Sequence, residues 1–109
     1  MELVGSLEEI VLMILLKNDK INSVEIAKEY YHAIGKNLSI PSIHVTLKRM
    51  QKKGWVKSEF GNPTAERGGR RKRNYWATPK AYEVLHELTE AKLKLWSGIT
   101  KPSLQYEQV

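Results

Sequence analysis

The stretch "SIPSIHVTLKRMQKKGWVKSE" (residues 39–59) decides the fold, because its hydrophobic period changes partway along. In its first part, apolar residues recur at i, i+4 and i+7, which is typical of one face of an amphipathic helix: Ile43, Leu47 and Met50. We predict that this helix starts between Ser39 and Ser42, with Pro41 in its first turn, and ends at Gly54.

After Gly54 the period becomes two, which indicates a β-strand over residues 55–60. Val56, Ser58 and Phe60 alternate with Trp55, Lys57 and Glu59. Residues 61–63, Gly-Asn-Pro, end this strand. The stretch therefore predicts a helix followed directly by a strand.

The outward face of the predicted helix carries no acidic residue from Ser39 through Lys57. An ordinary solvated helix mixes charges of both signs, so this face is better explained as a DNA-contacting surface. Lys53 also falls on or near it. The residues that we expect to contact DNA here are Ser39, Ser42, His44, Val45, Lys48, Arg49 and Lys52.

A second basic segment, "ERGGRRKRNYWAT" (residues 66–78), follows the strand. Residues 74–77 are predicted to form a return strand, which makes the segment the tip and second strand of a β-hairpin wing. Trp55 and Trp76 are expected to brace the wing strands. The wing residues that we expect to contact DNA are Gly69, Arg70, Arg71, Lys72 and Arg73.

The charge distribution supports DNA binding. The 109 residues include 18 Lys and Arg against 12 Asp and Glu, a net charge of +6. Residues 48–73 hold ten basic and two acidic residues, so this quarter alone carries +8 and the remainder −2. A positive excess concentrated in one segment is expected of a protein that binds a phosphate backbone.

Two helices are predicted before this region. Ser6 and Glu9 form a predicted capping box that opens a helix to Leu16. This helix is apolar nearly all round, and we expect a second subunit to supply part of its cover. Asn22 and Glu25 cap a second helix to Ile34, stopped by Gly35. Its expected apolar stripe is Val24, Ala27, Tyr31 and Ile34, widened by Ile26 and Tyr30.

A long final helix is predicted to start at Thr78-Pro79 and to run through Trp96. Its apolar residues approach a heptad spacing, which suits packing against a partner helix. We expect residues 1–97 to form one domain and residues 98–109 a flexible tail. The expected dimer contacts are Leu7, Val11, Ile14, Leu85, Leu88, Leu95 and Trp96.

Composition excludes several classes. No cysteine is present, which excludes disulfides and thiolate chemistry. The longest apolar run, residues 10–16, is far shorter than the ~20 residues that span a bilayer, so we expect a soluble, cytoplasmic protein without membrane contact. His32, His44 and His86 lack metal-ligand spacing. No catalytic or nucleotide-binding motif is recognisable, so we expect no enzyme activity, metal or cofactor.

The order of elements predicts a mainly α winged helix-turn-helix, with a three-helix core, a two-stranded wing and a C-terminal dimerisation helix. Residues 3–88 resemble the PadR-like transcriptional regulators. The resemblance is carried by "SLEEIVLMILL", by residues 39–59 and by "GGRRKRNYWATPKA". Wing residues that match the family pattern are Gly69, Arg70, Lys72, Arg73, Tyr75 and Thr78. Asn74 and Ala77 depart from it, and so do His44 and Val45, where a tyrosine and a proline are usual.

The resemblance implies a homodimeric bacterial repressor of the short C-terminal type, dimerised through its first and last helices. Each recognition helix would enter one half of a palindromic operator, with half-sites about 34 Å apart or a multiple of it. Some short members bind planar aromatic drugs at the dimer interface, which makes Trp96 a candidate ligand contact. Two alternatives remain: a DNA binder without a small-molecule inducer, and a winged-helix module that binds an acidic protein.

Overall fold

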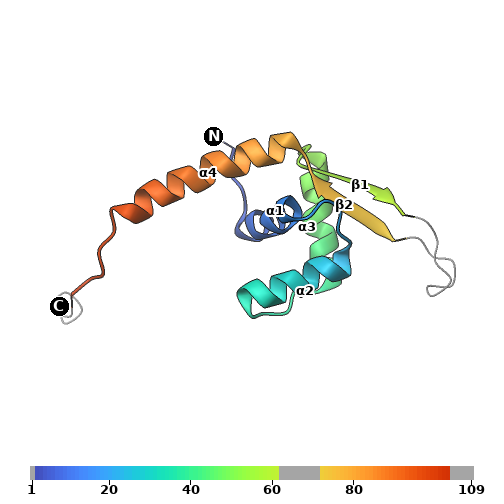
Figure 1. Ribbon diagram of the computed structural model, residues 1–109, viewed down its shortest axis with the longest axis horizontal. Coiled ribbons are helices and arrows are strands. Elements are labelled where there is room, and N and C mark those ends of the chain that lie inside the picture. Colours follow the sequence, from blue (N-terminus) through green and yellow to red (C-terminus); the bar gives the residue numbers. More distant parts are fainter. Residues whose placement is uncertain (1, 62–71, 104–109) are drawn as a thin grey trace.

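Four helices and one β-hairpin make up the computed structural model, which describes residues 2–61 and 72–103 (Figure 1). This confirms the predicted winged helix-turn-helix architecture. Within the described residues, no helix is both long and apolar enough to cross a membrane. In chain order the elements are α1 (Ser6–Lys17), α2 (Ser23–Ile34), α3 (Ile40–Lys52), β1 (Val56–Phe60), β2 (Arg73–Ala77) and α4 (Pro79–Ser97).

Helix α1 lies at the centre of the fold, in contact with α2, α3, α4 and β2. These elements of the same chain cover most of its apolar surface, whereas Met13 and Leu16 remain exposed. Val11 and Ile14, expected at a dimer interface, are buried in the core of the single chain, and so is Leu85 of α4. The sequence pattern showed that α1 is covered on several sides, but it did not show by what.

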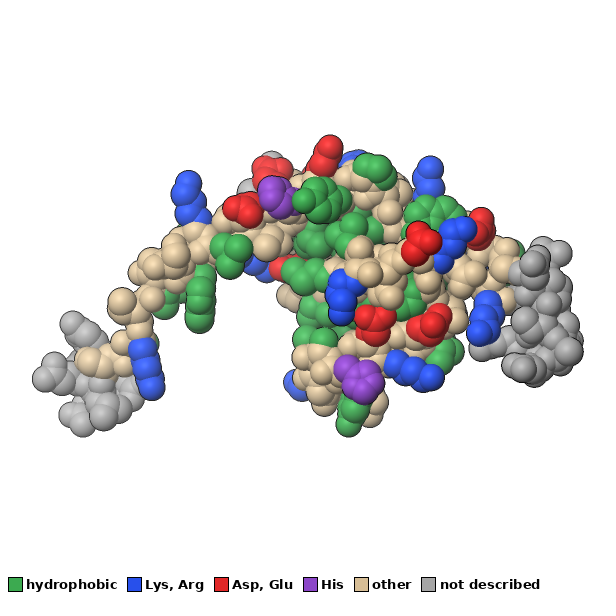
Figure 2. Space-filling view, in the orientation of Figure 1, with side chains coloured by type: hydrophobic (Ala, Val, Ile, Leu, Met, Phe, Trp, Pro, Cys, Tyr) green, Lys and Arg blue, Asp and Glu red, His purple; other side chains and the backbone are tan. Residues whose placement is uncertain are grey.

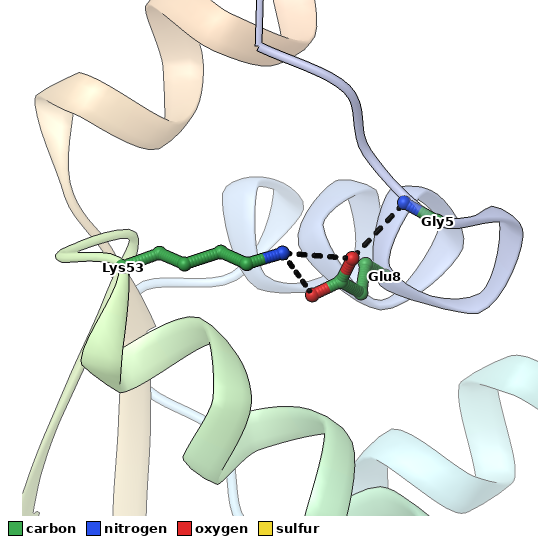
Figure 3. Close-up of polar contacts among 3 residues, drawn as sticks. All are labelled: Gly5, Glu8 and Lys53. Carbon is green, nitrogen blue, oxygen red and sulfur yellow. Dashed lines mark hydrogen bonds and ion pairs between the residues drawn. The ribbon is translucent and has the colours of Figure 1, made fainter.

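The start of α1 differs from the prediction by one residue. Gly5 occupies the N-cap position, and the Glu8 carboxylate accepts a hydrogen bond from the Gly5 amide at 3.0 Å. Glu8 is only 6% exposed, and Lys53 at the end of α3 donates to the same carboxylate at 3.1 Å (Figure 3). Glu9, predicted to complete the cap, instead pairs with Lys92 of α4 at 2.6 Å.

Helix α2 has the predicted ends but a different buried face. Asn22 and Glu25 form the reciprocal cap, and Gly35 ends the helix at a φ of 80°. Ile26 is the buried residue, with Ala27 and Tyr30 packed beside it. The expected stripe was wrong for three positions, which are exposed: Val24, Tyr31 and Ile34. Two apolar stripes overlap on this helix, and packing on α1 and α3 selects the one through Ile26.

The hairpin pairs β1 and β2 antiparallel, from Val56 opposite Ala77 to Phe60 opposite Arg73. Ile21 exchanges backbone hydrogen bonds with Tyr75 at 3.1 and 2.9 Å, so the second strand is also anchored to the loop before α2. Trp55 precedes β1 and lies in the core at 1% exposed.

Helix α4 packs on the core at its N-terminal end and is free of the core at its C-terminal end (Figure 1). Thr78 caps it, accepting from the Ala81 amide and donating to the Gly54 carbonyl at 2.7 Å. Ala81 and Leu85 are buried, while the C-terminal half of the helix extends away from the body, on the side opposite the hairpin (Figure 1). The molecule is accordingly elongated, with extents of 63 × 28 × 20 Å.

Candidate nucleic-acid interface

Helix α3 has the two faces that its sequence predicted. Ile43, Leu47 and Met50 are fully buried, together with Thr46, whose hydroxyl donates to the Ser42 carbonyl at 2.9 Å. Every outward residue expected to contact DNA is exposed: Ser39, Ser42, His44, Val45, Lys48, Arg49 and Lys52.

The N-terminus of α3 is fixed by its two serines. The Ser39 side chain accepts from the Ser42 amide at 3.2 Å, and its hydroxyl donates to the Ser42 hydroxyl at 2.8 Å. Val45 follows as a 57% exposed aliphatic side chain. No acidic residue lies in the first turn. The positive end of the helix dipole is therefore not neutralised by a carboxylate in that turn.

Lys53 behaves differently from its neighbours on α3. Its ammonium group pairs with the buried Glu8 carboxylate (Figure 3). It also lies 4.5 Å from the centre of the Trp55 ring. Lys53 is exposed, as expected for a residue on or near the outward face, but these contacts also tie the end of α3 to α1.

The wing is described at its base. Arg73 is the first residue of β2, and Lys72 directly precedes it. Three predicted wing contacts fall outside the described residues: Gly69, Arg70 and Arg71. Arg73 is held by two contacts from β1. Its Nη1 donates to the Ser58 hydroxyl at 2.8 Å, and its guanidinium carbon lies 4.0 Å from the centre of the Phe60 ring. The side chain is thereby oriented although it is exposed.

A cavity of about 240 Å³ brings the two predicted DNA-contacting elements together. His44 of α3 lines it, with Lys72 and Arg73 from the wing. Sequence reasoning missed its remaining wall, which comes from the start of α2 and from the hairpin: Asn22, Ser23, Val24, Phe60 and Tyr75. The cap at Asn22 was recognisable, but its proximity to His44 depends on the packing of α2 against α3.

Burial and charge modify two groups near the hairpin. Burial raises the pKa of the Tyr75 phenol above its ordinary value of 10.0. A hydrogen bond and ion pair with Glu59 of β1 raise the pKa of Lys20, which lies in the loop between α1 and α2. Lys20 also lies 5.2 Å from the centre of the Trp76 ring. Glu59, an acidic residue on β1, is therefore neutralised by a partner from outside the wing.

The free end of α4 is apolar. Leu95 is 74% and Trp96 69% exposed, and Leu93 and Ile99 are exposed beside them. They line an open cavity of about 470 Å³ together with Glu9, Thr89 and Lys92. Figure 2 shows hydrophobic side chains protruding from the underside of this half of the helix. Leu7 and Leu88, also expected at a dimer interface, are partly buried.

The described residues contain no group of three or more histidine, aspartate or glutamate side chains placed to hold a metal ion. His86 lies on the exposed surface of α4, 3.6 Å from Glu90 and stacked on Tyr82. His44 lines a cavity that also contains basic residues from another element.

Residues 4–96 match the family model of the penicillinase repressor. A PadR-like transcription factor from Bacteroides fragilis is similar in structure, with a TM-score of 0.75 and 20% identity over 85% of each chain. A PadR family regulator from Clostridium difficile R20291 has a TM-score of 0.68 and 26% identity over 85% of this chain and 92% of that one.

Bacillus subtilis PadR, solved in complex with operator DNA, has a TM-score of 0.65 and 17% identity over 90% of this chain and 50% of that one. No curated protein sequence matches the chain. The resemblance to PadR-like regulators that the residues predicted is confirmed by the family model and by these structures. The chain belongs to the penicillinase repressor family, and it is a PadR-like transcriptional regulator and not an enzyme.

Proposed function

We propose that this regulator binds a palindromic operator in double-stranded DNA as a homodimer and represses transcription there. The observation that carries the proposal is the cavity where His44 of α3 meets Lys72 and Arg73 of the wing. A basic, acid-free helix and a basic hairpin that converge on one side of a small domain suit a helix in the major groove with a wing beside it.

The roles within this surface follow from side-chain chemistry. Lys48, Arg49 and Lys52 are suited to phosphates, because long cationic side chains bind the backbone of any sequence. Ser42, His44 and Val45 lie nearer the N-terminus of α3, the part of a recognition helix that contacts base edges. We assign phosphate or minor-groove contacts to the wing residues Gly69, Arg70, Arg71, Lys72 and Arg73.

The salt dependence of binding to a random DNA duplex tests the proposal. A protein that neutralises several phosphates loses affinity steeply between low and physiological salt, because it displaces condensed counterions. We expect a slope of log K against log salt of several units. A flat dependence would contradict DNA binding and would favour the alternative that the basic face docks on an acidic protein.

Selection of bound sequences from a random duplex pool tests the dimer and the operator together. Two copies related by a twofold axis would select inverted half-sites about 34 Å apart, or a multiple of it. Recovery of a single unpaired half-site would contradict the proposed dimeric binding.

The free end of α4 supports homodimerisation. Its exposed apolar side chains, Leu93, Leu95, Trp96 and Ile99, lie close together, and such a patch favours contact with another apolar surface. We assign this contact to a second copy of the chain, with Leu7 and Leu88 at its margin. We propose a cytoplasmic location, because the proposed ligand is chromosomal DNA.

We further propose that a planar aromatic effector binds at Trp96 and releases the repressor. An exposed indole beside an apolar cavity of about 470 Å³ is suited to stacking. Planar aromatics should quench tryptophan fluorescence in the wild type, and the quenching should disappear in Trp96→Ala. Quenching that persists in the variant would favour the alternative of a DNA binder without a small-molecule inducer.

A further inference from the structure

The Ser58 hydroxyl, on β1, joins the recognition helix to the wing. Gln51, near the end of α3, donates to it from Nε2 at 2.8 Å, and Arg73 of β2 donates from Nη1 at the same distance. A hydroxyl oxygen has two lone pairs, so Ser58 is able to accept both hydrogen bonds at once. The side chain is half-buried, which limits competition from water.

This junction determines where Arg73 points. The guanidinium stacks on Phe60, and a stacked guanidinium keeps freedom to slide and turn in the plane of the ring. A hydrogen bond at Nη1 removes that freedom because it fixes one edge of the planar group. Arg73 is thereby held where it lines the same cavity as His44 and Lys72.

The junction also connects the two elements that approach DNA. Gln51 belongs to α3, so its hydrogen bond links the Ser58 oxygen directly to the recognition helix. Arg73 is then oriented with respect to α3 and not only with respect to its own hairpin. Such coupling keeps the distance between a wing cation and His44 constant, as simultaneous contact with one DNA duplex requires.

We propose that Ser58 is a positioning residue for DNA recognition, acting through Arg73 by holding its guanidinium in register with the recognition helix. This rests on the proposed DNA-binding function and deepens it. Ser58 itself need not touch DNA. Its effect is transmitted through the two hydrogen bonds that it accepts.

The test compares Ser58→Ala with Ser58→Thr in the full chain, using the operator selected from the random pool. Loss of the hydroxyl should weaken operator binding by about threefold to tenfold, the range of one hydrogen bond. It should also lower the slope of log K against log salt by about one, as expected when one phosphate contact is lost. Ser58→Thr keeps the hydroxyl and a strand-compatible side chain and should restore both values. Ser97→Ala, which removes an exposed hydroxyl from the end of α4, is the matched control and should bind as the wild type.

A double-mutant cycle with Arg73→Ala decides whether Ser58 acts through the arginine. In the Arg73→Ala background, Ser58→Ala should have no further effect on affinity or on the salt slope. An equal loss in both backgrounds would overturn the proposal, and so would wild-type binding by Ser58→Ala. If the wild-type chain shows no salt-dependent DNA binding, the proposed function itself fails. Normal wild-type binding with a silent Ser58→Ala overturns only the positioning role.

Discussion

His44 is the described residue of α3 that faces the wing across a shared cavity. It is exposed on the recognition helix, and its imidazole has both a donor and an acceptor for base edges. Phosphate contacts act on all sequences alike, whereas base contacts act on one sequence. We propose that this difference separates His44 from Lys48, which lies one helical turn further along α3.

We expect His44→Ala to reduce discrimination between the selected operator and random DNA by roughly 1–3 kcal/mol. Lys48→Ala should instead weaken binding to both by similar factors. Competition between labelled operator and unlabelled random duplex at fixed salt measures the ratio. If His44→Ala loses affinity equally for both DNAs, His44 does not contact bases.

Tyr75 gives a prediction about pH. Because burial raises the pKa of its phenol above 10.0, the unfolded chain ionises at a lower pH than the folded one. The free energy of unfolding is unaffected below about pH 10 by this group and falls as the pH rises through the folded pKa. Lys20, whose pKa is raised by Glu59, acts in the same direction: its contribution is complete below 10.5 and is lost above.

Tyr75→Phe should therefore flatten the loss of stability above pH 10, without abolishing it. Urea denaturation at pH 8, 10 and 11 measures the change. Tyr82→Phe, an exposed position on α4, is the control and should retain the wild-type alkaline loss. A wild-type pH profile in Tyr75→Phe would contradict the coupling between burial and ionisation.

At the scale of elements, the Glu8–Lys53 pair joins the start of α1 to the end of α3 (Figure 3). Glu8 is 6% exposed and also caps α1 through the Gly5 amide. A carboxylate at this depth depends on its partners, because a buried charge without compensation is costly. Lys53 is itself 38% exposed at its side chain, which moderates the effect.

We expect Lys53→Met to lower the free energy of unfolding by roughly 1–3 kcal/mol, less than for a fully buried pair. Lys52→Met removes the same charge from the adjacent exposed position and should stay within about 0.5 kcal/mol of the wild type. Urea denaturation followed by tryptophan fluorescence at one protein concentration measures both. Equal stability of the two variants would contradict a structural role for the pair.

The helices and strands also show which structural features can be predicted from residues close together in the sequence. The caps of α2 and α4, the buried stripe of α3 and the paired strands follow from residues close together in the chain, and these predictions are confirmed. The N-cap of α1 was wrong by one residue because two consecutive glutamates, Glu8 and Glu9, are each able to supply the carboxylate that accepts a hydrogen bond from the N-cap amide. In the structure Glu8 takes this role, and its carboxylate also accepts a hydrogen bond from Lys53, which is 45 residues away.

At the scale of the molecule, the apolar residues form two groups: one is buried in the core, and the other is exposed at the free end of α4. Val11, Ile14 and Leu85 are buried in the single chain, so we assign the proposed contact with a partner to the exposed end of α4. The wing and this end extend in opposite directions from the body (Figure 1). In the proposed dimer, DNA contacts and subunit contacts are therefore made by separate parts of the chain.

Leu95→Glu should weaken dimerisation by roughly tenfold or more, because it places a charge in the apolar patch. Lys94→Glu adds the same carboxylate at the neighbouring exposed position and should have the smaller effect. Sedimentation over a range of protein concentrations gives the monomer–dimer equilibrium. If both variants dimerise as the wild type does, the end of α4 is not the interface.

The sequence by itself determined the order of elements, the caps of α2 and α4, the basic face of α3 and the family resemblance, because these depend on periodicity and on residues a few positions apart. Only the tertiary structure decided which face of α2 is buried and what covers α1. It also decided that Lys53 pairs with Glu8, and that His44 and Arg73 line one cavity. These facts depend on how helices and strands pack across tens of residues, and side-chain spacing within one element carries no information about the surface that will face it.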